Sequence, residues 1–166
     1  MPAPRQIVYV DTNVVIEAVD ACCWAALLNK FDVRTVAEVR RETQAGNRLI
    51  KSYVVVDKTQ FDARVTVAEV TNVQLAAAQL RTPLLNQIDA GERHLLAYVA
   101  AHDKNALLLT TGDRAAVRAA CALGLDDCLR SLEELAGACG QKPALAEWFT
   151  KKWLAKVKTE FLLDTM

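Results

Sequence analysis

Ile7-Val8-Tyr9-Val10-Asp11-Thr12 is the most informative stretch of this sequence for its fold. The four apolar residues at its start have the character of a buried parallel strand. Asp11 and Thr12 then supply a polar turn, and residues 14–28 read as one helix. A strand, a polar turn and a helix in this order predict the opening unit of an α/β fold with a mainly parallel sheet.

Size and charge bound the class of protein. The chain has 166 residues, which predicts one domain, and its 20 basic and 20 acidic residues give a formal net charge of zero. A neutral chain excludes broad electrostatic attraction to nucleic acid or membranes, although a local basic patch stays open. The apolar run at the N-terminus ends at Val10 without a cleavage signal, and no run of about 18 apolar residues follows. We therefore expect a cytoplasmic protein with no membrane segment.

The residues after the first helix predict a second strand–helix unit. Residues 33–35 form a short candidate strand. Thr35-Val36-Ala37-Glu38 has the spacing of a capping box, which predicts a helix from Thr35 that ends at Gly46.

The middle of the chain is read as a hairpin and a helix. Residues 53–56 and 64–70 are rich in β-branched side chains, so we expect two strands paired around 57–63. Residues 72–81 read as a helix, which Pro83 ends because proline lacks the backbone donor.

The last third alternates helices and strands more clearly. We expect helices over 89–102, 114–123 and 131–138 and strands over 106–111 and 125–129.

We expect a linker at 140–143 and two parts of the chain, a domain of residues 1–140 and a C-terminal amphipathic helix at 141–166. The apolar stripe of this helix recurs every four residues, at Leu145, Phe149, Trp153, Val157 and Phe161. Packing of the stripe on the domain's own core is the first interpretation. A contact with a partner or a second copy in a homodimer is the second, and RNA binding by the neighbouring lysines is the third.

Two aspartates stand where strands of the predicted sheet end. Asp11 directly follows the first strand, and Asp113 follows the 106–111 strand after one glycine. Ligands of open α/β sheets bind outside the carboxyl ends of the strands, so neighbouring strands would bring both carboxylates to one crevice. The structural alternative is that each aspartate only caps the helix that follows it.

Two glutamates are candidates for the same crevice. Glu38 fits the third position of the predicted capping box, whereas Glu42 lies one turn further on the same helix face without such a role. Glu42 is therefore the freer candidate of the two. Glu92 could cap its helix through the Asp89-x-x-Glu92 spacing, point into the crevice, or do both.

Carboxylates that converge in one crevice repel each other unless a cation lies between them. Mg²⁺ and Mn²⁺ prefer oxygen ligands, and a pair of such ions can activate water for phosphodiester cleavage. The acids therefore predict a divalent-metal site that accepts a phosphate backbone.

In order along the chain, four segments resemble the motifs of the PIN-domain ribonuclease family. Residues 11–13 resemble its strand-DTN opening, 35–42 its second segment, 89–92 its third, and 111–113 its T-x-D turn. The acids that match are Asp11, Glu42 (better than Glu38), Glu92 and Asp113.

The resemblance implies a three-layer α/β/α sandwich that binds Mg²⁺ or Mn²⁺ through Asp11, Glu42, Glu92 and Asp113. It also implies metal-dependent endonuclease activity, usually on RNA. Many relatives are toxins of bacterial toxin–antitoxin pairs, which suggests an antitoxin-like partner, and others act in RNA processing. Relatives often carry a further acid just after the fourth motif, where Ala115 and Ala116 stand here, so one metal ion or two stays open.

The predicted supporting residues are hydroxyls, an amide and arginines. Thr12, Asn13 and Thr111 could orient the acids by hydrogen bonds. Arg40, Arg41 and Arg114 are candidate phosphate contacts.

Two other classes compete with the nuclease. One is a catalytically inactive member of the same fold that acts as a binding or assembly module. The other is a receiver-type phosphoacceptor domain with Asp57 as acceptor, which would need a lysine where Thr110-Thr111-Gly112 stands.

Overall fold

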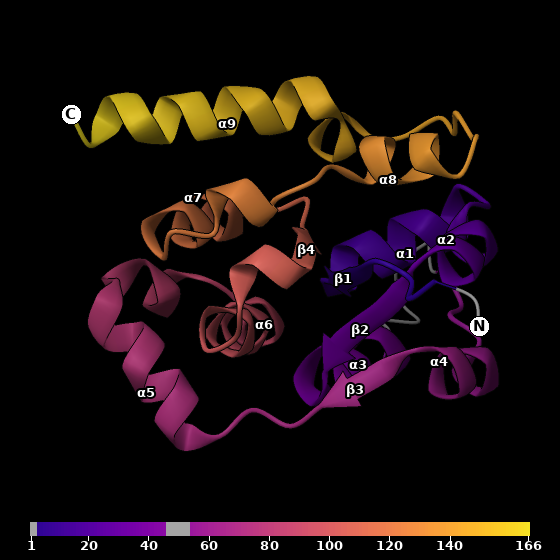
Figure 1. Cartoon of the computed structure of the whole chain (residues 1–166), viewed down its shortest axis with the longest axis horizontal. Helices are drawn as coiled ribbons and strands as arrows, with labels where there is room; N and C mark the ends of the chain where they lie inside the picture. The colour runs from indigo at the N-terminus through magenta and orange to yellow at the C-terminus, as the bar shows by residue number, and fades with distance from the viewer. Residues whose placement is uncertain (1–2, 46–53) are drawn as a thin grey trace.

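The computed structural model describes residues 3–45 and 54–166. In this part of the chain, four strands form one sheet in the order β3-β2-β1-β4, and all three neighbouring pairs are parallel (Figure 1). The strands are β1 (Ile7–Val10), β2 (Asp32–Val36), β3 (Thr66–Ala68) and β4 (Leu107–Thr110). The predicted α/β class with a parallel central sheet is confirmed.

Side chains alternate between the two faces of the sheet, so each face has its own core. On β1, Val8 and Val10 belong to one cluster of buried residues and Tyr9 belongs to the other. The first face packs against α1 (Thr12–Asp20), α2 (Trp24–Lys30), α4 (Lys58–Arg64) and α8 (Leu132–Ala138). The second face packs against α3 (Ala37–Ala45), α5 (Asn72–Arg81), α6 (Ala90–Ala100) and α7 (Arg114–Ala122). Figure 1 shows α6 and α7 on one side of the strands and α1 and α2 on the other, as a three-layer α/β/α sandwich requires.

The clearest periodic segments fold as predicted. β1 and α5 have the predicted bounds, and β4, α7 and α8 differ from them by only one or two residues. In these segments the local pattern and the buried surface demand the same structure, which makes them readable from sequence.

The predicted helix over 14–28 is wrong as a single helix, because α1 ends at Asp20 and α2 begins at Trp24. Cys22 adopts a positive φ of 60°. The N–H groups of Cys22 and Cys23 donate to the carbonyls of Val19 and Ala18, the pattern of a Schellman helix end. Glycine is the usual residue at such a helix end, so the cysteine at this position did not allow the end of α1 to be predicted from the sequence.

The predicted capping box at Thr35 is wrong, because Thr35 lies inside β2. Its buried Oγ1 donates a hydrogen bond of 2.7 Å to the carbonyl of Val10 on the neighbouring strand. α3 starts two residues later, at Ala37, and the predicted stop at Gly46 lies outside the described residues.

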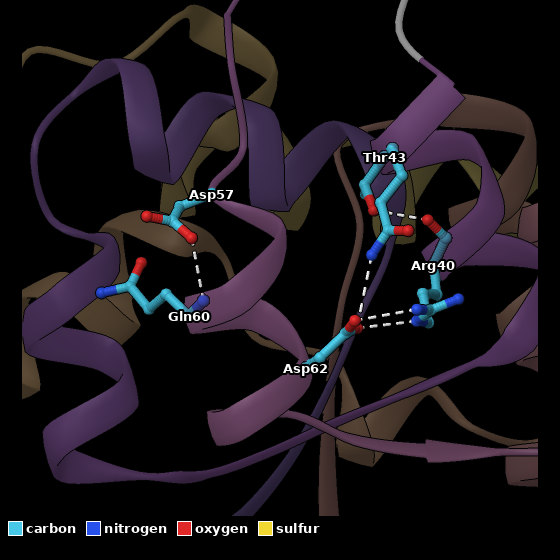
Figure 2. Close-up of polar contacts among 6 residues, drawn as sticks. Arg40, Thr43, Asp57, Gln60 and Asp62 are labelled. Carbon is cyan, nitrogen blue, oxygen red and sulfur yellow. Dashed lines mark hydrogen bonds and ion pairs between the residues drawn. The ribbon is translucent and has the colours of Figure 1, made fainter.

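The predicted hairpin of 53–56 and 64–70 is also wrong. Val54, Val55 and Val56 form no strand, and Tyr53 lies outside the described residues. α4 occupies most of the expected loop, and its N-cap Asp57 accepts a hydrogen bond of 2.9 Å from Gln60 N (Figure 2). A helical crossover of this kind lets β3 lie parallel to β2.

Short 3₁₀ turns replace or extend several predicted elements. The predicted strand over 125–129 is a 3₁₀ turn, η3 (Asp126–Cys128), and only Leu129 bridges to β4, at Leu109. The remaining turns are η1 (Pro83–Gln87), η2 (Lys104–Ala106) and η4 (Glu147–Phe149).

The C-terminal helix α9 (Lys151–Asp164) lies along α7 and begins beside α8 (Figure 1). Leu154 and Val157 are buried in the core of the second face, while Phe149, just before the helix, is buried in the core of the first. The stripe is thus packed on the chain's own core over much of its length. None of the helices in the described ranges is long and apolar enough to cross a membrane.

Candidate metal centre

β1 and β4 are neighbours in the sheet, and their registers place Val10 beside Thr110. The chain leaves both strands at the same edge, where Asp11 and the turn Thr111-Gly112-Asp113 follow. The condition under which these two strand exits lie together, adjacency of β1 and β4, is therefore met. The structure therefore brings the regions around Asp11 and Asp113 to one end of the sheet, at the starts of α1 and α7.

Asp11 is the most buried of the four acids, with 1% of its surface exposed. Its Oδ1 accepts a hydrogen bond of 2.6 Å from Thr12 N at the start of α1. Its Oδ2 accepts one of 2.8 Å from Thr111 Oγ1. The pKa of Asp11 is raised to about 7, mainly by burial; the two hydrogen bonds lower it, and the charges of Glu42 and Asp113 add smaller increases.

Asp113 caps α7 while it stands next to the other acids. Its Oδ1 accepts a hydrogen bond of 2.8 Å from Ala116 N, and its own N–H donates to Thr111 Oγ1 at 3.3 Å. Asp113 therefore does cap the helix that follows it, as the structural alternative predicted. The same carboxyl also lies close enough to Asp11 and Glu92 to raise the pKa of each.

Glu42 connects three of the predicted segments. Its Oε2 accepts a hydrogen bond of 2.7 Å from Thr12 Oγ1, and its Oε1 accepts one of 3.0 Å from Gly91 N at the start of α6. A β-carbon on Gly91 would lie 2.8 Å from the carboxyl carbon of Glu42, so only glycine leaves room for this approach.

Glu38, the alternative second acid, makes different contacts. It forms an ion pair with Arg41 on the same helix, and the hydrogen bond from that guanidinium lowers the pKa of Glu38. Of the two glutamates, the structure places Glu42 beside Thr12 and Gly91.

Glu92 caps its helix, as one of its predicted roles requires, and it also lies near the other acids. Its Oε2 accepts a hydrogen bond of 3.3 Å from Asp89 N, which caps α6, and only 6% of its surface is exposed. The pKa of Glu92 is raised to about 8. Burial is the largest cause, and the charges of Asp11, Asp113 and Asp89 also contribute. Burial and acidic neighbours destabilise the charged form of this carboxyl.

Hydrogen bonds thus link the four predicted segments into one network. Thr111 joins Asp113 to Asp11, and Thr12 joins the segment of Asp11 to Glu42. Thr12 and Thr111 orient acids as expected, whereas the side chain of Asn13 is exposed.

The donor set has the chemistry that a hard divalent cation requires. The four side chains offer only oxygen, and none of them is in an ion pair within residues 3–45 and 54–166. Over the same ranges, no three His, Cys, Asp or Glu side chains are grouped so as to hold a metal ion. The carboxylate oxygens of Asp11, Glu42, Glu92 and Asp113 each accept a hydrogen bond from a backbone N–H or a hydroxyl group.

The three arginines considered as phosphate contacts all pair with acids. Arg40 forms a two-pronged pair with Asp62 at 2.7 and 2.9 Å, which joins α3 to α4 (Figure 2). Arg41 pairs with Glu38, and Arg114 pairs with Glu160 at 3.0 Å.

Asp57 was the acceptor in the receiver-type hypothesis, which required it to follow a strand. It instead caps α4, and the residues just before it form no strand, so the structure does not support that hypothesis.

Sequence reasoning missed Phe149 as a residue of this region. Its ring packs against Gly112, between Thr111 and Asp113. The apolar stripe showed that Phe149 would be buried, but no local pattern indicates which glycine it covers.

No protein-family model matches this sequence, and no curated protein matches it either.

Proposed function

We propose that this chain is a Mg²⁺- or Mn²⁺-dependent endoribonuclease of the PIN-domain type. The observation that carries the proposal is that hydrogen bonds through Thr12, Gly91 and Thr111 link the four distant segments that carry Asp11, Glu42, Glu92 and Asp113 at the carboxyl end of the sheet. The charges of Asp11 and Asp113 also raise the pKa of Glu92. A helix cap alone needs one of these acids at a time, and it does not need acids from four distant segments at one end of the sheet.

In this proposal, Asp11 and Asp113 would hold the metal directly, and Glu42 and Glu92 would complete its surroundings or position the attacking water. A bound divalent cation would supply Lewis-acid activation of water and charge neutralisation at the phosphate. Thr111 Oγ1 and Thr12 N fix the two oxygens of Asp11, so its carboxyl is oriented before any ligand arrives. Thr12 Oγ1 and Gly91 N fix Glu42 in the same way.

Glu92 is the residue best suited to move a proton. It is buried, and three neighbouring acids favour its protonated form, so the Oε atoms can hold a proton near neutral pH. RNA is the proposed substrate because the resemblance to PIN-domain ribonucleases supports it. An antitoxin-like partner is a further proposal that rests on that resemblance. Homodimer formation through the apolar stripe of the C-terminal segment and a cytoplasmic location are proposals that rest on the sequence.

Cleavage of RNA in the presence of Mn²⁺ or of a chelator tests the proposal. The variants are Asp11→Asn and, as a matched control, Asp57→Asn, because both aspartates cap a helix and only Asp11 belongs to the network. We expect wild type and Asp57→Asn to cleave with Mn²⁺ only, and Asp11→Asn to be inactive. Equal metal-dependent cleavage by wild type and Asp11→Asn would reject the mechanism. No cleavage together with no Mn²⁺ binding in calorimetry would favour the inactive binding module.

A further inference from the structure

The C-terminal segment reaches the acidic network at the turn that carries Asp113. Gly112 lies between Thr111, which hydrogen-bonds to Asp11, and Asp113, which caps α7. A β-carbon on Gly112 would lie 2.9 Å from Cδ1 and 3.0 Å from Cζ of Phe149. The aromatic ring therefore occupies the space that any side chain at Gly112 would need.

Phe149 has little freedom to move away from this turn. Only 3% of its surface is exposed, and it belongs to the core of the first sheet face. Just before it, Ala146 N donates a hydrogen bond of 3.1 Å to Oε1 of Glu17 on α1. Just after it, Lys151 N donates one of 3.1 Å to Oε1 of Glu133 on α8. The segment that carries the ring is thus fastened to two helices.

The helix after Phe149 also fixes α7, whose first turn Asp113 caps. Arg114 pairs with Glu160 at 3.0 Å, and Arg118 pairs with Asp164 at 3.0 Å. Leu154 is buried against the same core as Val117 of α7. The tail therefore contacts the turn through Phe149 and holds the helix that follows it.

We infer that Phe149 is a positioning residue of the carboxylate site. Its ring fixes the Thr111-Gly112-Asp113 turn, so that the Thr111 hydroxyl stays on Asp11 and the Asp113 carboxyl stays beside it. This role rests on the proposed function, because it matters only if these acids bind a metal ion. The C-terminal segment lies outside the residues that resemble the family. Through Phe149 it would nevertheless help to position the site.

The test compares Phe149→Ala and the milder Phe149→Leu with Leu154→Ala in the full chain. Leu154 is a matched control, because it is buried in the same tail and packs on α7 without being among the nearest atoms to Gly112. The first measurement is hydrogen exchange of the Ala116 amide, the donor to Asp113 Oδ1, in metal-free protein. The second is Mn²⁺ affinity by calorimetry.

We expect Phe149→Ala to speed exchange at Ala116 beyond its effect on global unfolding and to weaken Mn²⁺ binding by about 10- to 100-fold. Phe149→Leu should recover part of both. Leu154→Ala should lower stability with Mn²⁺ affinity within about 3-fold of wild type, the usual scatter for a site not touched by the change. Equal effects of Phe149→Ala and Leu154→Ala on both measurements would overturn the inference.

A double-mutant cycle gives a second measurement that survives failure of the proposed function. Gly112→Ala should destabilise the protein when Phe149 is present, and less so in Phe149→Ala, because removal of the ring makes room for the new methyl group. Additive effects would show that the ring does not hold the turn. If wild type binds no Mn²⁺, the proposed metal site is wrong. Exchange at Ala116 and this mutant cycle still decide whether Phe149 fixes the turn.

Discussion

Thr111 Oγ1 donates a buried hydrogen bond of 2.8 Å to Oδ2 of Asp11, across 100 positions of the sequence. The same oxygen accepts the N–H of Asp113 at 3.3 Å. One hydroxyl thus connects the two strand exits on which the proposed site is built.

Thr111→Val keeps the shape of the side chain and removes this connection. We expect a loss of about 1 to 3 kcal/mol in the free energy of unfolding, since buried Asp11 loses a donor. Mn²⁺ affinity should fall by about 10- to 100-fold, as for other residues that orient metal ligands. Thermal unfolding and calorimetry measure the two effects.

Thr110→Val is the matched control for this change. Thr110 is fully buried on the adjacent position of β4, but its Oγ1 has no hydrogen-bond partner among the described residues. Valine there should be neutral or stabilising, with unchanged Mn²⁺ affinity. The orienting role of Thr111 is wrong if both valine variants behave alike.

Gly91→Ala should displace Glu42. The new methyl carbon would lie 2.8 Å from Cδ and 2.9 Å from Oε1 of Glu42, so the hydrogen bond from Gly91 N to that oxygen must be lost. We expect lower stability and at least about tenfold weaker Mn²⁺ binding, measured by the same two methods.

Gly137→Ala is the control for that variant, since Gly137 also lies in a helix and a β-carbon added there would meet no other described segment of the chain within 4 Å. It should stabilise the protein by about 0.5 to 1 kcal/mol. A Gly91→Ala protein that is equally stabilised, with full Mn²⁺ affinity, would contradict the position of Glu42.

The sequence was sufficient for the fold class and for the acids at the strand exits, but it could not supply the packing around them. β1 and the turn before Asp113 are readable because apolar strands and polar exits follow each other within a few residues. The break at Cys22 was not readable, because a cysteine took the conformation that glycine usually marks. Thr35 misled for a related reason. Its hydroxyl has the spacing of a helix cap, but it bonds to the carbonyl of Val10, a partner that only the assembled sheet provides. The cover of Phe149 over Gly112 is likewise a long-range contact that no local pattern encodes.

Metal-free protein should become more stable as the pH falls from about 8 to about 5. The pKa of Asp11 is raised from 3.8 to about 7, and that of Glu92 from 4.5 to about 8. Between these limits the folded state binds more protons than the unfolded state, so the free energy of unfolding decreases as the pH rises. Glu38 and Asp62 have lowered pKa values and act in the opposite direction only at more acidic pH.

Thermal unfolding at a series of pH values, in chelator, measures this dependence. The midpoint should shift by about 2 to 4 °C for each kcal/mol in a chain of this size. Asp11→Asn should flatten the curve, because the amide does not titrate. A midpoint that instead rises between pH 5 and pH 8 would contradict the buried, uncompensated state of these two acids.

Glu92→Gln should separate stability from function. The amide oxygen of glutamine can still accept the hydrogen bond from Asp89 N, so the cap of α6 survives while the repulsion from Asp11 and Asp113 is removed. We therefore expect the metal-free variant to unfold at a higher temperature than wild type at pH 8 and to lose the stabilisation by Mn²⁺ that wild type shows. Glu134→Gln is the control, because Glu134 accepts a hydrogen bond of 2.8 Å from Ser131 N in the same position of α8, away from the four acids. That variant should be slightly less stable than wild type and keep its response to Mn²⁺. If Glu92→Gln is destabilised as Glu134→Gln is and still responds to Mn²⁺, then Glu92 is only a helix cap and the proposed site loses one of its four acids.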